Sequence, residues 1–450
     1  MIVRKSRLPL LLSLFLCGTA SAQNYSGDAR KIGMGGIGDS GSLAPGMIGE
    51  KRPYHSMVVP LALIQLYQDH ERLDPGHDSF NPLLVLEYAA NPLHYVFGRA
   101  PAGNIGRFVS DVVNGTVNRD LNVYRGSAPV NEFLAAGLAS PNWGKTFKII
   151  QRKDGAFHGF YAGIGPYLSA GTDLNIDRQL TEVFASTTPV LIANRTFTNT
   201  NVSNAQVALA VSGGYRGRIP WPGRSIAGKA SRDGIYLGAN YSYLRGFLYQ
   251  NADIHIRLDT DSNGLLTIVP AVNPVVIDLL DSHSGSGFAI DLGLAAVIDR
   301  WEFGFGVTGI ANRIEWREPV LKRYSLLSLV AGTDLISQNL PEPASKLRVE
   351  LPVNYTGSGA FHLDDWTFVT EMSHGFQKIS FHCGFERRLG ILDLRGGGRY
   401  SLDRWSPTGG IGLNLGRHFS LDVAAFGTNT NIERQMRPAL ALSLRLNHVE

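Results

Sequence analysis

The sequence predicts an all-β protein: a transmembrane, antiparallel β-barrel of about 14 strands with an N-terminal plug segment. Three observations support this fold. Apolar and polar residues alternate with a period of two through most of the C-terminal half. Tight turns and longer polar links alternate between these segments. The chain also begins with an export signal, and no later run of about 18 apolar residues could form a transmembrane helix.

The alternation is clearest in "GFAIDLGLAAVID", which is followed by a two-residue turn and by "WEFGFGVTG". In each segment the apolar side chains occupy one face and the polar or small ones the other, a pattern that a helix cannot produce. Each predicted strand is about 9–12 residues long, the length that a tilted strand needs to cross a bilayer. The same pattern recurs at 366–372, 379–386, 392–395, 411–416, 419–425 and 440–446.

The connections fall into two kinds. Short turns are expected at 299–300, 364–365, 388–390 and 416–418, and longer links at 317–352, 373–377, 401–408 and 427–435. Short turns at one rim and longer loops at the other are typical of outer-membrane barrels. A secreted sandwich or propeller is the alternative, but its strands are usually nearer 5–6 residues and its blades repeat.

The predicted domains are a signal peptide at 1–22, a plug at 23–81 and the barrel at 82–450. The signal has three basic residues, an apolar run at 8–16 and a small-residue cleavage site ending at Ala22. Its removal takes three positive charges from the formal +4, leaving +1, so we expect no nucleic-acid partner. It also leaves Cys383 as the only cysteine, which excludes an intramolecular disulfide and a cysteine-based zinc site.

The segment "KIGMGGIG" contains Gly33-x-Gly35-x-x-Gly38, the spacing of a dinucleotide-binding loop. Such a loop needs a buried strand before it and a helix after it, and the flanking residues predict neither. We therefore interpret Gly33, Gly35, Gly36 and Gly38 as plug residues that pack closely against a barrel wall, where bare backbone fits and positive φ is allowed.

Together these features resemble the FadL/TodX family of outer-membrane transporters and its PorV-like and TraF-like relatives. The resemblance rests on "DARKIGMGGIGDSG" after the signal, and on "GFAIDLGLAAVIDRWEFGFGVTGIAN", "ELPVNYTGSGAFHLDDWTF" and "HCGFERRLGILDLRGGGRY" in the barrel. The chain departs from the family pattern in two places. Leu43-Ala44-Pro45-Gly46 stands where Asn-Pro-Ala is usual, and the last strand lacks a terminal aromatic residue.

Candidate site residues lie on the face opposite the apolar one. Among them Asp291, Glu386 and Arg395 are expected to hold the plug or line the path, and the alternative is a salt-bridged, solvated interior. Pro166 cannot donate a ladder hydrogen bond, so it marks an edge, a kink or the end of a strand. The resemblance implies a lateral exit for an apolar substrate near 163–167.

The resemblance implies a channel for passive uptake of hydrophobic small molecules, of the long-chain fatty acid or hydrocarbon type, in the bacterial outer membrane. The expected partners are outer-membrane lipid and a hydrophobic ligand, without catalytic residues, cofactor or metal. The alternative is a PorV-like or TraF-like barrel that serves secretion or conjugation proteins. A continuous apolar pocket beneath the loops around 100–142 and 317–352 would favour transport. A large exposed apolar patch on those loops, or a sealed polar lumen, would favour the partner role.

Overall fold

The structure is a computed structural model that describes residues 28–37, 43–48, 54–73, 84, 87–88, 91, 93–99, 103–126, 131–139, 143–221, 232–267, 273–326, 336–341, 346–375, 379–401, 404–416, 418–429, 431 and 435–447. The predicted signal peptide and Gly38 lie outside these residues. In chain order the helices are α2 (Ala29–Gly33), α3 (Leu43–Ile48), α4 (Ala62–Gln68), α5 (His70–Leu73), α7 (Gly103–Asn114), η2 (Leu121–Tyr124) and α8 (Arg178–Ala185). None of the helices in these residues is long and apolar enough to cross a membrane.

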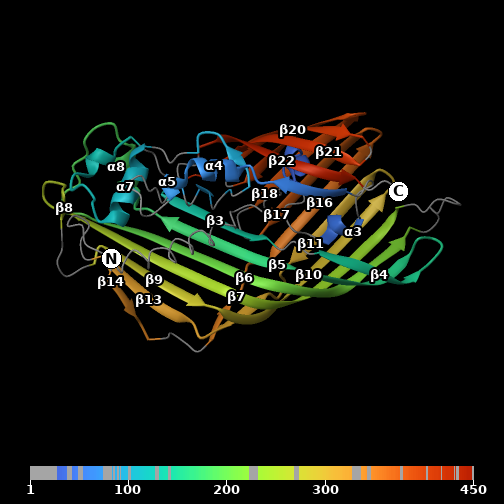
Figure 1. Cartoon of the computed structure of the whole chain (residues 1–450), viewed down its shortest axis with the longest axis horizontal. Coiled ribbons are helices and arrows are strands. Elements are labelled where there is room, and N and C mark those ends of the chain that lie inside the picture. Colours follow the sequence, from blue (N-terminus) through green and yellow to red (C-terminus); the bar gives the residue numbers. More distant parts are fainter. Residues whose placement is uncertain are drawn as a thin grey trace.

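Strands dominate the described chain (Figure 1). They are β1 (Tyr54–Val59), β2 (Tyr95–Val96), β3 (Glu132–Ala139), β4 (Trp143–Gln151), β5 (Phe157–Asn175), β6 (Thr196–Pro220), β7 (Gly234–Thr260), β8 (Leu266–Thr267), β9 (Val275–Ser282), β10 (Ser284–Ile298) and β11 (Trp301–Thr308). The remainder are β12 (Arg313–Arg317), β13 (Val320–Leu326), β14 (Ile336–Asn339), β15 (Lys346–Val349), β16 (Asn354–Leu363), β17 (Trp366–His374), β18 (Ser380–Leu389), β19 (Leu392–Ser401), β20 (Arg404–Leu415), β21 (Phe419–Thr428) and β22 (Arg437–Asn447).

All the described strands belong to one antiparallel sheet. Pairing runs from β22 down to β16 in reverse chain order, then to β11, β10, β7, β6 and β5. One end of this row is formed by β1 and β2, which pair with β22. The other end is formed by β3 and β4, which pair with β5. The row is strongly curved (Figure 1) and antiparallel, which agrees with the type of sheet that the sequence predicts.

The short turns lie where the sequence predicts them, between β10 and β11, β16 and β17, β18 and β19, and β20 and β21. Asp299, Asp364, Gly390 and Gly416 have positive φ at these turns. Two expectations are corrected. The 317–352 link is not simply a loop, because β13 pairs with β9 and β15 with β12. The sheet also begins before residue 82, because β1 lies within the predicted plug segment and pairs with β22.

From β16 to β22 the inward face of the sheet is largely polar and the outward face is apolar. Large apolar side chains such as Phe305 of β11 and Ile411 of β20 are about half exposed, 51% and 52%. Their neighbours on the opposite face are buried and polar, among them Glu371, Glu386, Arg395, Asp422 and Arg445. A soluble protein has the reverse arrangement, whereas a barrel in lipid presents its apolar face to hydrocarbon. The strands therefore cross a membrane.

A β-bulge marks where this arrangement ends. Ala208 of β6 is opposite Gly246 and Val207 is opposite Leu248, so Phe247 of β7 is an extra residue. On β6, the buried residues from Gln206 to Ser212 are even-numbered, as are Arg216 and Arg218, whereas Phe197, Asn199, Ser203 and Ala205 are buried at odd-numbered positions. Beyond the bulge an ordinary apolar core joins α7, η2 and α8 to β6, β7, β9 and β13. The bulge is thus close to the edge of the membrane-spanning region.

Candidate functional site

The N-terminal segment lies inside the barrel and begins with helix α2. The Asp28 side chain caps this helix by accepting from the backbone N–H of Arg30, at 2.9 Å. The backbone N–H of Ala29 donates to Ser443 Oγ of β22, at 3.1 Å. Helix α2 packs against β19, β20, β21 and β22, and its Ile32 joins a small apolar cluster on the inward face of β21 and β22. The helix is therefore fixed to one wall of the barrel.

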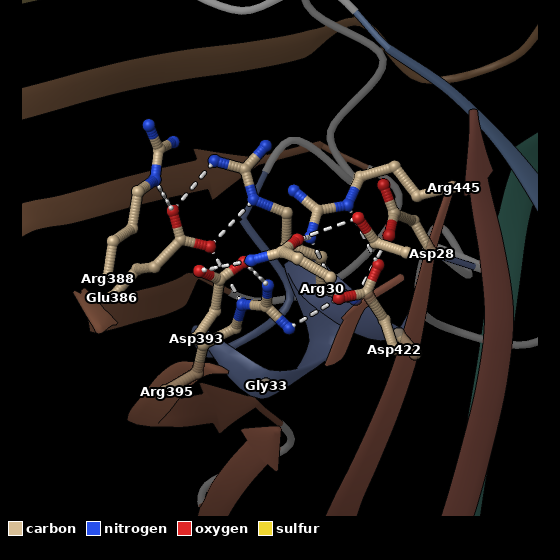
Figure 2. Close-up of polar contacts among 12 residues, drawn as sticks. Asp28, Arg30, Gly33, Glu386, Arg388, Asp393, Arg395, Asp422 and Arg445 are labelled. Atoms are coloured by element: carbon tan, nitrogen blue, oxygen red, sulfur yellow. Dashed lines mark hydrogen bonds and ion pairs between the residues drawn. The ribbon is translucent and has the colours of Figure 1, made fainter. Parts of the chain in front are cut away.

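An ion cluster fastens α2 to this wall (Figure 2). Arg30 makes two contacts with the carboxylate of Glu386 on β18, Nε–Oε2 at 2.8 Å and Nη2–Oε1 at 3.1 Å. Arg395 of β19 and Arg388 also contact Glu386, at 2.8 Å and 3.1 Å. The side chains of Glu386 and Arg395 are fully buried. One carboxylate thus binds three guanidinium groups, one of which belongs to the plug.

The cluster continues toward the last strands. Arg395 bonds Asp422 at 2.8 Å and Asp393 at 3.1 Å, and Arg445 of β22 bonds the same two carboxylates, at 3.1 Å and 2.9 Å. Buried charges persist only when they are paired and hydrogen-bonded. The four arginines Arg30, Arg388, Arg395 and Arg445 are balanced by the four acids Asp28, Glu386, Asp393 and Asp422. We call these eight residues the ion cluster.

Glycines let the plug backbone touch the wall backbone. Gly35 has φ +90°, and a Cβ on it would lie 2.6 Å from the carbonyl oxygen of Cys383. A Cβ on Gly384 of β18 would lie 2.4 Å from the carbonyl oxygen of Met34, and one on Gly397 of β19 would lie 2.8 Å from the nitrogen of Gly35. A Cβ on Gly33 would lie 3.2 Å from Gly410 Cα. Side chains at these positions would separate the two surfaces.

Three polar bonds complete this contact. Gly35 N–H donates to Thr408 Oγ1 of β20 at 3.0 Å, and the Thr408 hydroxyl donates to the carbonyl of Gly33 at 3.2 Å. His382 Nδ1 is 2.6 Å from the carbonyl oxygen of Gly35. Because that oxygen can only accept, the ring nitrogen is the donor. Each of these backbone groups of the plug turn therefore has a partner on the wall.

Helix α3 lies against a different wall. It packs on β7, β10 and β11, which are separated from β19 in the strand order by β18, β17 and β16. Met47 and Ile48 pack on Tyr236, Ala295 and Val297. Arg232 donates to the carbonyl of Ile48 at 3.5 Å. The N-terminal segment thus contacts two separate walls, one mainly through charges and the other mainly through apolar side chains.

An apolar cluster, which we call the apolar lining, joins β5, β6, β7, β10 and β12. Its buried residues include Tyr167, Leu244 and Tyr249, with Ile314 and Trp316 of β12. Trp316 is fully buried, and its ring stacks on Tyr249 with centroids 5.6 Å apart. Leu347, Val349 and Leu351 from the 317–352 region pack against this apolar lining. The lumen therefore has a charged wall and an apolar wall.

The structure divides the predicted site residues into two groups. Gly33, Gly35, Glu386 and Arg395 lie together where α2 meets the charged wall, and Gly36, with φ +78°, follows in the same turn. Pro166 and Asp291 lie on β5 and β10 instead. Asp291 accepts from the backbone N–H of Gly309 at 2.8 Å, so it holds the turn after β11. Pro166 does not begin or end a strand, because β5 continues through it and pairs with Leu209.

The site residues predicted from the sequence do not include Arg30, Asp28, His382 or Thr408. They also do not include the wall glycines 384, 397 and 410. A signal for the glycines was present, because glycine inside a strand often marks a close approach of another backbone. No comparable signal exists for Arg30, since nothing in its local sequence indicates a partner on β18. Among the described residues, no group of three or more His, Cys, Asp or Glu side chains could hold a metal ion.

Comparisons with known proteins give structural likeness only. No protein-family model matches the sequence, and no curated protein matches it. Among solved structures, the Pseudomonas putida toluene transporter TodX is similar at 11% identity, covering 78% of this chain and 98% of its own, with a TM-score of 0.32. The Ralstonia pickettii toluene transporter TbuX has 11% identity, coverage of 78% and 96%, and a TM-score of 0.28. Outer membrane phospholipase A from Escherichia coli has 11% identity, coverage of 54% and 79%, and a TM-score of 0.22.

The inside-out barrel decides the class of protein. An antiparallel sheet with an apolar outer belt and buried charges on its inner face is typical of the β-barrels of bacterial outer membranes. The chain is an outer-membrane β-barrel. In this barrel, α2 is docked on the inner face of the charged wall, and the apolar lining lies on the wall formed by β5, β6, β7, β10 and β12.

Proposed function

We propose that this barrel is a channel for the passive uptake of hydrophobic small molecules across the outer membrane, of the hydrocarbon or long-chain fatty acid type. The apolar lining carries the proposal. Channels for hydrophilic solutes have polar, water-filled interiors. Here Leu244 and Trp316 face inward and are fully buried among other apolar side chains. An apolar solute gains free energy by leaving water for such a surface.

The N-terminal segment, with α2 and α3, acts in this proposal as the plug. It contacts both the charged wall and the wall that carries part of the apolar lining, so its position controls the path between them. The substrate enters from the extracellular side, passes along the apolar lining and leaves when α3 moves or through the side of the barrel. The toluene transporters TodX and TbuX are consistent with this substrate class, although their likeness to the chain is limited to the fold.

Residues 163–167 are the candidate side exit on β5. Strand β3 ends at Ala139, which pairs with Leu168 of β5. Strand β4 begins at Trp143, which pairs with Ile164 of β5. Pro166 therefore lies between two separately paired stretches, and Tyr167 beside it belongs to the apolar lining. The alternative role, as a partner of secretion or conjugation proteins, has no specific observation in its favour within the described residues.

The test is uptake by the purified protein in proteoliposomes, using an apolar fluorescent dye and a hydrophilic solute of similar size. We expect uptake of the dye and exclusion of the hydrophilic solute. Leu244→Asn places an amide in the apolar lining and should lower dye uptake about tenfold, because the unpaired amide opposes passage of an apolar solute. Leu244→Met keeps volume and polarity and serves as the control. A folded Leu244→Asn protein with unchanged dye uptake would contradict the proposal.

A further inference from the structure

Two neighbouring side chains on the inner face of the sheet have polar atoms without a hydrogen-bond partner among the described residues. They are Ser169 of β5 and Gln206 of β6, which are opposite each other in the strand register. Both are buried, at 3% and 2% exposed. The unpartnered atoms are the Ser169 hydroxyl and Nε2 of Gln206. Because each of these groups can donate a hydrogen bond, we call the two residues the donor pair.

The orientation of the Gln206 amide is fixed by Trp316. Its Oε1 accepts from the indole N–H of Trp316, at 3.3 Å. Since an indole nitrogen can only donate, the amide oxygen must face Trp316 and the NH2 group must face elsewhere. The Trp316 ring is held in turn by stacking on Tyr249, which is opposite Gln206 in the register of β6 and β7. Gln206 therefore offers a donor, and not an acceptor, beside these two rings.

The donor pair lies at one end of the apolar lining. Tyr167 and Ala208 are two positions away from the pair on the same face of β5 and β6, and both belong to the lining. The pair is on the side of the lining farther from the short turn between β10 and β11. Short turns are periplasmic in outer-membrane barrels. The donor pair is thus at the extracellular end of the lining, where a substrate arrives.

One oxygen atom can satisfy both donors. Side chains at paired positions of antiparallel strands have Cβ atoms about 4.5–5.5 Å apart, so Ser169 and Gln206 reach the same point. A carbonyl oxygen has two lone pairs and accepts from two donors. Buried polar groups in native proteins are nearly always hydrogen-bonded. Two unpartnered donors side by side therefore indicate an oxygen acceptor supplied by a ligand.

The surroundings of the donor pair favour a neutral oxygen. The positions level with the pair and next to it on the same face of the sheet carry uncharged residues: Gly171, Asn204, Asn251 and Leu280 on one side, Tyr249 and Ser282 level with it, and Tyr167, Ala208, Gly246 and Gly285 on the other side. A buried carboxylate would find no cation among these residues. Burying an unpaired charge is far more costly than burying a hydrogen-bonded carbonyl.

We infer that the donor pair is a binding subsite for the oxygen of a neutral, oxygen-bearing hydrocarbon, such as a ketone or an ester. The ligand oxygen accepts from Ser169 and Gln206, and the hydrocarbon body lies against the apolar lining. This inference rests on the proposed uptake function and narrows its substrate class. The protein selects such a molecule over a plain hydrocarbon, which leaves both donors unpartnered, and over a fatty-acid anion, whose charge is unpaired.

The experiment compares three competitors of similar shape that differ in one polar group. Benzophenone is a neutral ketone, diphenylmethane has a CH2 group in place of the carbonyl, and diphenylacetate is a carboxylate. Each competes with the apolar dye for uptake into proteoliposomes that contain the wild type. We expect benzophenone to inhibit at an about tenfold lower concentration than diphenylmethane, because it makes two additional hydrogen bonds. Diphenylacetate should inhibit least.

Variants separate the donor pair from the rest of the wall. Ser169→Ala removes one donor and keeps the bond between Gln206 and Trp316, so the preference for benzophenone should fall from about tenfold to about threefold. Adding Gln206→Leu should abolish the preference. Ser242→Ala is the matched control, because this buried serine on the same wall already bonds Ser212, at 2.7 Å. It should keep the full preference. Heat-dependent mobility in detergent gels verifies that each variant is folded.

A second measurement does not depend on uptake. Benzophenone reacts at its carbonyl carbon with nearby C–H groups when it is illuminated, so the label should fall on 167–171 or 204–208 in the wild type and decrease in Ser169→Ala.

Several outcomes would overturn the subsite and leave the uptake function standing. They are dye uptake without a preference for benzophenone, an equal loss of preference in Ser242→Ala, and a label that falls elsewhere. If diphenylacetate is the strongest competitor, the recognised group is a carboxylate and the neutral class is wrong. If the wild type takes up no apolar dye, both proposals fail.

Discussion

Arg30 and Glu386 are 356 positions apart in the sequence, yet their side chains form a two-point ion pair at 2.8 Å and 3.1 Å inside the barrel. Arg30 is on the plug helix and Glu386 is on β18. The pair joins two parts of the molecule that no local interaction brings together. It also makes plug attachment depend on charges that are shielded from water, where pairing is strong and loss of one partner is costly.

Glu386→Gln should loosen the plug more than Arg30→Gln. The first change removes the carboxylate that three arginines contact. The second change leaves Glu386 in contact with Arg388 and Arg395. Loss of one member of a buried ion pair costs about 3–5 kcal/mol. We expect Glu386→Gln to lower the temperature of heat-induced mobility change and to raise single-channel conductance in planar bilayers. Equal effects of the two variants would show that Glu386 is not the centre of the cluster.

Gly35→Ala should displace the plug turn, because the new Cβ would lie 2.6 Å from the carbonyl oxygen of Cys383 and φ is +90°. Gly416→Ala is the matched control. It has φ +83° in a turn with open space around it, so it tests backbone strain alone. The control should lose about 1 kcal/mol of stability without a leak. Ion leakage through Gly35→Ala and not through Gly416→Ala supports the docking role, and equal leakage refutes it.

Deletion of Phe247 should prevent assembly. This residue is the extra one in the β-bulge opposite Val207. Without it, β7 would keep its register with β6 but would have one residue fewer than the β9–β10 segment between Gly246 and Tyr249, so its pairing with β9 or with β10 would shift by one residue. Phe247→Tyr keeps the bulge and is the control. The measurement is the fraction of folded, heat-modifiable protein after refolding into detergent, and a deletion variant that folds normally would show that the bulge is dispensable.

Acid should loosen the β9–β13 pair outside the membrane. The hydrogen bond from Arg323 lowers the pKa of the Asp278 carboxyl below its usual 3.8. Because the pKa of this carboxyl is lower in the folded state, its contact with Arg323 stabilises the folded protein above pH 3.8. This stabilisation is lost as the pH falls through the folded-state pKa. The effect is modest, because both side chains are partly exposed. Hydrogen exchange at 275–282 should rise below about pH 4 in the wild type relative to Asp278→Asn. Identical pH profiles in the two proteins would exclude this contribution.

The sequence alone determined the barrel and the direction of its side chains. An alternation of period two assigns each residue of a strand to one face, so the pattern by itself places Asp291, Glu386 and Arg395 inside and Phe303 outside. Positive-φ residues at tight turns are equally local, which is why the turns at 299–300 and 364–365 could be predicted. Each of these features is decided by residues close together in the chain.

The tertiary structure decided which inward residues meet. Periodicity gives the face of a side chain but neither the order of strands around the barrel nor the position of a plug within it. The partner of Arg30 and the carbonyl above Gly384 follow only from that packing. The bulge at Phe247 also interrupts the pattern, and a single strand carries no signal of where its neighbour shifts. The stretch with dinucleotide-loop spacing thus acquires its role from the wall that it touches.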